Sequence, residues 1–384
     1  MKLTLHNGFL AVLAICCTTA ISSCVKDLPS DNEPNQALSS NTSLFVATDR
    51  HEAGDGNNLA AAIQFATSRL DAVVPSLVLL GGDYVGRGPD HGTAGQPAFS
   101  LADLRNEIYR TLDPLSTRTL FTYGSHDRGC TDGYQAFFSG PHRADGYYVY
   151  GISYAQMTFA TDSLAQSAIE RYLAQGDSAD ITPTPPPDTA AADTTGSRPA
   201  PPPANGSRPY NGIDAADPFG ISAESAAARF EAWVSSLNDH APIVVMSHVP
   251  IHSRRGDNPG GLRWLDALNR AARQHDIILF FGHNHSLEER GDNADQYCYL
   301  LTPGDTLRVQ GDSLQGSQLR TLGFTYANAG YLKLGWCTLV TFSDLDHDGH
   351  HDHVQLRRFN TTGIDNSQFG LTGKPNPYTL RLTR

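Results

Sequence analysis

The amino-acid sequence predicts an α/β fold in which buried strands alternate with helices. Short apolar runs recur along the chain, and segments with helical spacing of apolar residues lie between them. Each of the five clearest runs ends in an aspartate or a histidine. Because ligands gather at the carboxyl ends of strands in such folds, these polar residues are the first candidates for a functional site.

The expected elements follow from this alternation in chain order. Strands are expected where Val, Leu, Ile and Phe cluster over a few residues, and helices where apolar residues recur every three or four positions. The five strand segments, with their polar ends, are residues 43–49, 76–83, 119–127, 242–248 and 276–283, and the helical segments are 59–73, 101–112, 223–237 and 262–272.

The N-terminal 23 residues predict an export signal. One lysine precedes an apolar stretch over residues 9–21, which is too short to span a membrane and is typical of a secretory segment. The stretch ends in Ser22, Ser23 and Cys24, which resembles the lipobox of bacterial lipoproteins; an ordinary signal peptide is the alternative. We expect residues 1–23 to be removed, Cys24 to carry lipid, and residues 24–43 to form a flexible tether. The protein is then exported and anchored to a bacterial membrane, facing the periplasm or the cell surface.

Residues 44–384 are expected to form one domain. A stretch rich in Pro, Ala and Thr at about 177–209 lacks apolar side chains and predicts a solvated insertion within this domain. From residue 296 onward the helical pattern gives way to β-rich pieces, which we expect to form a second layer of sheet. These pieces are residues 306–310, 323–330, 337–342, 353–359 and 378–384.

Composition limits the classes of partner. The formal net charge is −12, and no run of lysine or arginine appears, so nucleic acid is not expected as the main partner. If the leader is removed and Cys24 is acylated, then Cys130, Cys298 and Cys337 remain, which permits one disulfide that the sequence does not assign. The sequence gives no indication of the oligomeric state.

The residues that close the apolar runs form a pattern of metal ligands. Carboxylate oxygens mixed with imidazole nitrogens suit Mn, Fe or Zn better than Ca or Mg, which prefer oxygen alone. A single H-x-H is also compatible with a histidine pair that only ends a strand, but five such pieces in order favour a metal site. They are Asp49-x-His51, Gly82-Asp83, Ser125-His126-Asp127, His248 and His283-x-His285.

This order of motifs resembles the calcineurin-like metallophosphoesterases, whose pattern is D-x-H, GD, GNH(D/E), a lone His and GHxH. The resemblance implies a four-layered αββα sandwich holding two divalent transition metal ions, with a β-rich C-terminal part. It implies hydrolysis of a phosphorylated small molecule or ester, a phosphomonoester or phosphodiester, by a hydroxide that bridges the metals. By the same resemblance Asp49, His51 and His285 hold the first metal, Asp83 bridges both, and His248 and His283 hold the second. The resemblance also implies that His126 contacts the phosphate and protonates or stabilises the leaving group.

The sequence departs from the family pattern at two positions. Ser125 replaces the asparagine whose amide oxygen is a metal ligand in the family, so the second metal would bind through a weaker donor or an added water. The stretch Gly82–Gly88 resembles the GDYVDRG of Ser/Thr protein phosphatases, but Gly86 replaces its second aspartate. These departures support an alternative function, a catalytically weak or inactive binding lipoprotein with the same fold.

Three arginines are candidate substrate ligands, because guanidinium groups match phosphate oxygens in pairs. Arg87 corresponds to the phosphate-binding arginine of the Ser/Thr phosphatase motif, and Arg254 and Arg255 follow His248 in a glycine-punctuated loop. Pairing with surface acids is the alternative for each. The segments around this loop and GHNHS also resemble a secreted bacterial branch of the superfamily.

A further acidic motif lies near the C-terminus. Oxygen ligands at alternate positions around a glycine turn are what Ca²⁺ requires, and the first half of the motif follows EF-hand spacing. Gln355 stands where the EF-hand has its bidentate glutamate, so an ordinary acidic hairpin tip is the alternative. The candidate calcium ligands are Asp344, Asp346, Asp348 and Asp352.

Overall fold

The computed structural model contains two six-stranded mixed sheets. It describes residues 41–51, 58–69, 74–86, 98–175, 217–252, 258–285, 300–310, 317–361, 368–369 and 374–383. In the first sheet, β1 (Asn41–Ala47), β2 (Leu77–Leu80) and β3 (Arg118–Phe121) are parallel neighbours. Three antiparallel strands extend this sheet beyond β1 in the order β12 (Trp336–Ser343), β13 (His353–Asn360) and β16 (Tyr378–Arg381).

The second sheet is parallel at its centre and antiparallel at its edges. Its central strands are β5 (Tyr148–Ile152), β6 (Ile243–Ser247), β7 (Ile277–Phe281) and β11 (Thr325–Asn328). The edge strands β4 (Gly140–Arg143) and β8 (Leu300–Leu301) pair antiparallel with β5 and β11.

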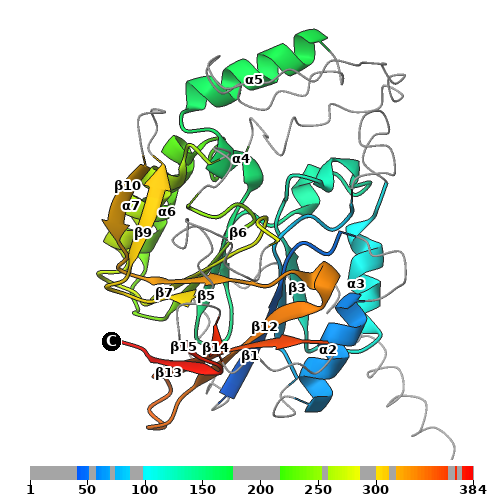
Figure 1. The fold of residues 1–384 in the computed structure, drawn as a ribbon, viewed down its shortest axis with the longest axis vertical. Coiled ribbons are helices and arrows are strands. Elements are labelled where there is room, and N and C mark those ends of the chain that lie inside the picture. Colours follow the sequence, from blue (N-terminus) through cyan, green and yellow to red (C-terminus); the bar gives the residue numbers. More distant parts are fainter. Residues whose placement is uncertain are drawn as a thin grey trace, which may run out of the picture. The chain divides into compact units, whose positions relative to one another are not determined.

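Successive side chains along the strands point to opposite faces of each sheet, which divides the core into layers. In β1, Leu44 and Val46 pack against Met246 and Phe280 of the second sheet, whereas Phe45 faces the helices on the other side. Helices α2 (Asn58–Arg69) and α3 (Leu101–Tyr109) cover the first sheet, and α6 (Ala223–Ser236) and α7 (Gly261–Ala271) cover the second (Figure 1). The fold is therefore a four-layered αββα sandwich, as predicted.

The remaining described elements are short or lie outside these layers. The hairpin β9–β10 packs Leu307 and Val309 into the core beside α7. Further elements are α4 (Tyr154–Thr158), α5 (Asp162–Gln175), η1 (Asp127–Gly129), η2 (Tyr134–Ala136), η5 (Leu332–Leu334), β9 (Thr306–Gln310), β10 (Ser317–Thr321), β14 (Gln368–Phe369) and β15 (Lys374–Pro375).

The C-terminal β-rich pieces do not form one added layer, and this expectation was wrong. β12, β13 and β16 join the sheet of β1, and β11 joins the sheet of β7, whereas β9 pairs with β10 and with no other described strand. The reason is pairing between distant segments, since β12 fills the free edge of β1 in antiparallel register. Strand β5 was not predicted, although it borders β6.

The predicted leader, Cys24 and the Pro-rich insertion at 177–209 lie outside the described residues. β1 starts at Asn41, within the last residues of the expected tether. Among the described helices, none is long and apolar enough to cross a membrane. Cys130 and Cys337 are free thiols, and Cys298 lies outside the described residues.

Candidate metal centre

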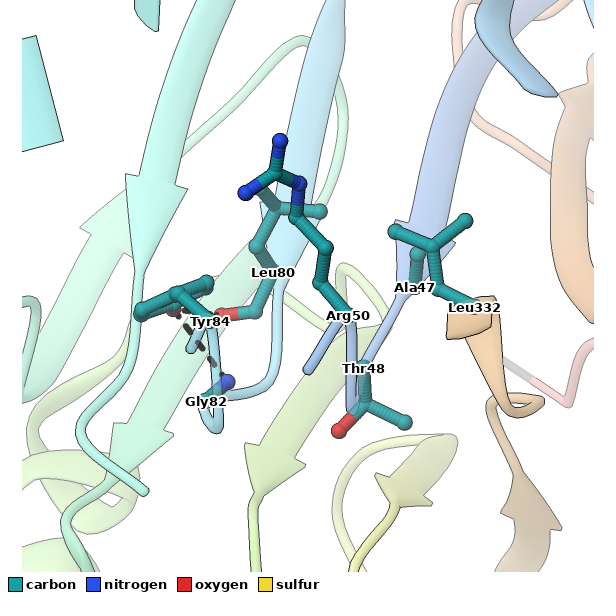
Figure 2. A pocket seen from close by; sticks show the side chains of 7 residues that line it. All are labelled: Ala47, Thr48, Arg50, Leu80, Gly82, Tyr84 and Leu332. Carbon is teal, nitrogen blue, oxygen red and sulfur yellow. Dashed lines mark hydrogen bonds between the residues drawn. The ribbon is translucent and has the colours of Figure 1, made fainter. Parts of the chain in front are cut away.

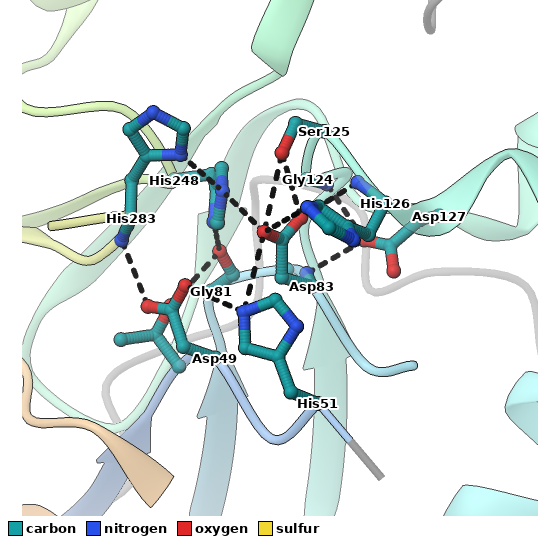
Figure 3. A network of polar contacts seen from close by, with 12 residues as sticks. Asp49, His51, Gly81, Asp83, Gly124, Ser125, His126, Asp127, His248 and His283 are labelled. Atoms are coloured by element: carbon teal, nitrogen blue, oxygen red, sulfur yellow. Dashed lines mark hydrogen bonds and ion pairs between the residues drawn. The ribbon is translucent and has the colours of Figure 1, made fainter. Parts of the chain in front are cut away.

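Residues that follow five strands converge on one cluster of carboxylates and imidazoles. β1, β2 and β3 are parallel neighbours, and so are β6 and β7, so each set of carboxyl ends meets at one sheet edge. Figure 3 shows the side chains after these strands pointing toward one another. The residues brought together are Asp49, His51, Asp83, Ser125, His126, His248 and His283, and His285 joins Asp49 and His51.

The backbone at these residues adopts a conformation that side chains rarely tolerate. Among the described non-glycine residues six have a left-handed φ, and five of them are predicted metal ligands. Each such residue costs on the order of 1–3 kcal/mol and persists only where its surroundings enforce it. The five, with their φ angles, are Asp49 (56°), His51 (44°), Asp83 (55°), His283 (68°) and His285 (52°).

Two glycines permit the close approach of the strand ends. A Cβ at Gly282 would lie 2.4 Å from Asp49 Oδ2, and one at Gly124 would lie 2.4 Å from the backbone nitrogen of Asp83. Because both distances are far below contact, only glycine lets the turns after β7 and β3 reach the two aspartates.

The first ligand group consists of two carboxylates and two imidazoles, from Asp49, Asp83, His51 and His285. His285 Nε2 lies 3.0 Å from Asp49 Oδ1 and 2.7 Å from His51 Nε2. His51 Nε2 also lies 3.6 Å from Asp49 Oδ1 and 3.6 Å from Asp83 Oδ2. Ligand atoms of all four residues lie within 4.8 Å of one another.

The second group shares Asp83 with the first. His248 Nε2 lies 3.2 Å from Asp83 Oδ2 and 3.2 Å from His283 Nδ1. Ligand atoms of these three residues also lie within 4.8 Å of one another. One carboxylate between two ligand groups is the arrangement that brings two cations close together.

Both aspartates are buried, and backbone NH groups hold one oxygen of each. Asp49 Oδ2 accepts hydrogen bonds from Thr48 Oγ1 (2.9 Å) and from the His283 NH (2.8 Å), so Oδ1 faces His285. Asp83 Oδ1 accepts from the His126 NH at 2.8 Å, while its Oδ2 faces His248. These bonds fix which oxygen of each carboxylate points into the cluster.

Electrostatics keep the aspartates ionised despite burial. Burial raises the pKa of Asp49, but hydrogen bonds from His285 and His51 outweigh it, and the pKa lies well below its usual range. Burial likewise opposes ionisation of Asp83, whose pKa is nevertheless lowered by the charge of His248. Burial lowers the pKa of His248, but the charge of Asp83 reverses this and raises the pKa to about 10. The cluster therefore demands positive charge.

The donor set fits divalent cations. His248 Nδ1 donates to the Gly81 carbonyl at 2.8 Å, which leaves Nε2 directed at Asp83. A neutral His248 would then aim a lone pair at a carboxylate, so a proton or a cation must lie between them. The Nε2 atoms of His51 and His285 face each other at 2.7 Å, so one of them must carry a proton or a cation must lie between them. Mixed oxygen and nitrogen donors suit Mn, Fe or Zn.

Ser125 and His126 lie beside the shared aspartate. The Ser125 hydroxyl donates to Asp83 at 3.2 Å from both carboxylate oxygens. His126 Nε2 lies 3.8 Å from Asp83 Oδ2, and its ring meets that of His51 edge to face at 4.9 Å. The His126 side chain is 16% exposed, so it borders the open side of the cluster.

Sequence reasoning missed the part played by Asp127. This fully buried carboxylate accepts backbone NH groups of Asp83 (2.9 Å), Tyr84 (2.9 Å) and Gly124 (2.7 Å), and so joins the turns after β2 and β3. Burial, followed by the charge of Asp83, raises its pKa to about 7. The aspartate that ends the motif GSHD was the available signal.

The structure does not bring the remaining predicted site residues to the cluster within the part of the chain that it describes. Arg87, Arg254 and Arg255 lie outside the described residues. In the loop between β12 and β13, carboxylates of Asp344, Asp346 and Asp348 lie within 4.8 Å of one another. The structure does not bring Asp352 into that group. Its carboxylate accepts from the Leu345 NH and lies 3.0 Å from His353 Nδ1.

Comparison with known proteins agrees with this geometry. The family described as calcineurin-like phosphoesterase matches residues 43–287. Among solved structures, "GAP50 the anchor in the inner membrane complex of Plasmodium" is 9% identical with a TM-score of 0.34, covering 90% of this chain and 89% of that chain. "Structure of PhoD" is 11% identical with a TM-score of 0.35, covering 88% and 72%. Both likenesses are too low to support a conclusion about activity, and no curated protein matches the sequence.

The family match spans well over half of the sequence and contains every residue of the metal cluster, so the chain belongs to the calcineurin-like phosphoesterase family.

Proposed function

We propose that this protein is a dimetal-dependent hydrolase of phosphoric esters that acts on phosphomonoesters or phosphodiesters. The observation that carries the proposal is that Asp83 belongs to both ligand groups. Asp49, His51 and His285 would hold one cation, His248 and His283 the other, and Asp83 would bridge them. Two bound cations would neutralise phosphate oxygens and lower the pKa of a water from about 16 toward about 7.

The protein residues would orient the reactants around that centre. Thr48 and the His283 NH hold one oxygen of Asp49, and the His126 NH holds one oxygen of Asp83, so the ligands need little rearrangement. His126, at the open side, would donate a proton from Nε2 to the leaving oxygen of the ester. We further propose that one of Arg87, Arg254 and Arg255 holds the phosphate, because an acidic chain needs local positive charge to bind an anion.

We also propose that the enzyme works outside the cytoplasm, exported and attached to a bacterial membrane through lipid on Cys24, with its domain facing the periplasm or the cell surface. The lipobox-like ending of the leader and the polar segment that follows it support this. Labelling of the full chain with radioactive palmitate tests it: a labelled wild type and an unlabelled Cys24→Ala variant are expected, and an unlabelled wild type would contradict it.

A second candidate function is a binding lipoprotein with weak or no turnover. Ser125 favours it, since its hydroxyl donates to Asp83 and offers a poorer metal donor than the asparagine of the family. We expect the Ser125→Asn variant to keep or raise activity, because the amide oxygen restores a ligand. The measurement is kcat/KM for an aryl phosphate with Mn, Zn or Fe added.

The experiment that separates the two functions is a panel of phosphomonoesters and phosphodiesters offered to the metal-loaded protein. Hydrolysis that requires added cations, and that chelators abolish, is the expected result. Two bound cations with no hydrolysis of any ester, in both wild type and Ser125→Asn, would favour the binding protein instead.

A further inference from the structure

Arg50 is the middle residue of the turn that carries Asp49 and His51. Both neighbours have left-handed backbone, with φ of 56° and 44°. Their NH groups donate to the carbonyls of Gly82 and Asp83, each at 3.0 Å. These bonds attach the turn to the end of β2 on either side of Arg50, and the side chain of Arg50 provides a further attachment in another direction.

That attachment is an ion pair with Glu107 on α3. Arg50 Nη2 lies 3.0 Å from Glu107 Oε2, and the two side chains are only 17% and 11% exposed. Glu107 belongs to the buried face of α3, together with Leu101, Leu104 and Ile108. A carboxylate in such a face is costly unless it is paired, so this partner is required rather than incidental.

The aliphatic part of Arg50 is packed as well. Figure 2 shows the side chain running past Leu80, and together with Tyr84 and Leu332 it lines a small space beneath the turn. These three neighbours belong to the apolar core between the first sheet and its helices. The arginine thus reaches from the turn beside the metal cluster past packed core residues to α3.

We infer that the Arg50–Glu107 ion pair positions Asp49 and His51 and thereby sets the affinity of the first cation. The pair restrains a turn that is strained on both sides and would otherwise relax toward ordinary backbone angles. Arg50 and Glu107 are positioning residues, since they act through the ligands. The inference rests on the proposed function, because it requires that cations bind at the cluster.

The test is a double-mutant cycle on the full-length chain with Mn²⁺ as the probe. Arg50→Met and Glu107→Gln each remove one charge, and the double variant removes both. Calorimetry gives the affinity and stoichiometry, and electron paramagnetic resonance distinguishes a coupled Mn²⁺ pair from a single ion. We expect each variant, including the double, to bind one of the two ions about 10- to 100-fold more weakly. This is the typical loss of affinity when a residue that orients a metal ligand is changed. At limiting Mn²⁺ the coupled spectrum should give way to that of a single ion.

The double variant separates positioning from simple stability. A single change strands a buried charge and lowers the unfolding temperature of the metal-free protein, whereas the double change removes that penalty. If the pair were only structural, the double variant would bind Mn²⁺ like the wild type, and this result would overturn the inference. If Arg50→Met does not fold, Arg50→Lys keeps the charge but lacks Nη2, the atom that contacts Glu107, and the same weakening is expected.

A matched control is the ion pair between Arg320 and Asp266, in β10 and α7. The variants Arg320→Met and Asp266→Asn should leave Mn²⁺ binding unchanged. A wild type that binds no Mn²⁺ at all would refute the proposed function itself, and the inference with it. A wild type that binds two ions, with Arg50 and Glu107 variants that bind them equally well, would refute the inference alone.

Discussion

Two parts of this protein gather carboxylates closely enough to hold a cation, and they do so in different ways. At the candidate metal centre, His285 meets Asp49 across 236 positions of sequence, and the members of the two ligand groups follow four different strands. In the loop between β12 and β13, Asp344, Asp346 and Asp348 come from one hairpin tip.

Burial distinguishes the two parts further. Asp49 and Asp83 are each 1% exposed, whereas Asp346 and Asp348 are exposed. The Asp344 carboxylate accepts the NH groups of Asp348 and Gly349, so it closes its own turn. Burying strained, charged residues from distant strands is costly and marks a functional site, whereas a local acidic tip also arises from turn formation alone.

The largest effect is expected from removing the shared ligand. In the Asp83→Ala variant both ligand groups lose a carboxylate. Substituting a residue that only orients a metal ligand typically costs roughly 10- to 100-fold in activity, and kcat/KM should fall by more than this. Metal analysis of the purified variant should show fewer than two cations per chain. Full activity in this variant would mean that the cluster is not the catalytic centre.

The next effect concerns the carboxylate that joins two turns of the centre. Asp127→Asn places an amide NH₂ among three backbone donors, which leaves buried groups unsatisfied at a cost of about 1–3 kcal/mol in the free energy of unfolding. We expect a lower unfolding temperature and weaker cation binding. Asp113→Asn, at an exposed turn where Asp113 accepts the Leu115 NH, is the control and should change neither. Equal behaviour of the two variants would contradict this role for Asp127.

A smaller effect is expected from the aromatic ring beside His285. The Tyr331 ring is parallel to that of His285 at 4.5 Å between centroids and perpendicular to that of His51 at 6.2 Å. Tyr331→Leu should weaken cation binding about tenfold, because the imidazole loses the surface that fixes its plane. Tyr331→Phe keeps the ring and should bind cations like the wild type. Loss in the Phe variant would instead assign the function to the hydroxyl.

The smallest effect is expected at the hairpin tip. Asp346→Asn combined with Asp348→Asn should change the free energy of unfolding by no more than about 0.5 kcal/mol, as surface changes usually do. Cation content at the metal centre should stay the same. A wild type that calcium stabilises against heat, with no such effect in the double variant, would show that the tip is a calcium site as well.

Local patterns predicted the layers and the cluster because both depend on short stretches of sequence. The apolar runs that became β1, β2, β3, β6 and β7 are each bounded by the polar residues that now meet. The sheet assignment of the C-terminal strands could not be predicted, because the pairing of β12 with β1 joins segments far apart in the chain. The ion pair of Arg50 with Glu107 was hidden for the same reason, since neither residue type nor spacing links the turn to α3. The motif GSHD drew attention to Asp127, but its role depends on backbone donors of two turns, and the sequence does not show that these turns meet.

We propose that distant aspartates and histidines form one centre for two cations that share Asp83. Anomalous diffraction from crystals of the Mn²⁺-loaded protein tests this most directly. Two anomalous peaks are expected, one beside Asp49, His51 and His285 and one beside His248 and His283, with Asp83 contacting both. A single peak, or peaks only at the loop of Asp344, Asp346 and Asp348, would contradict the claim.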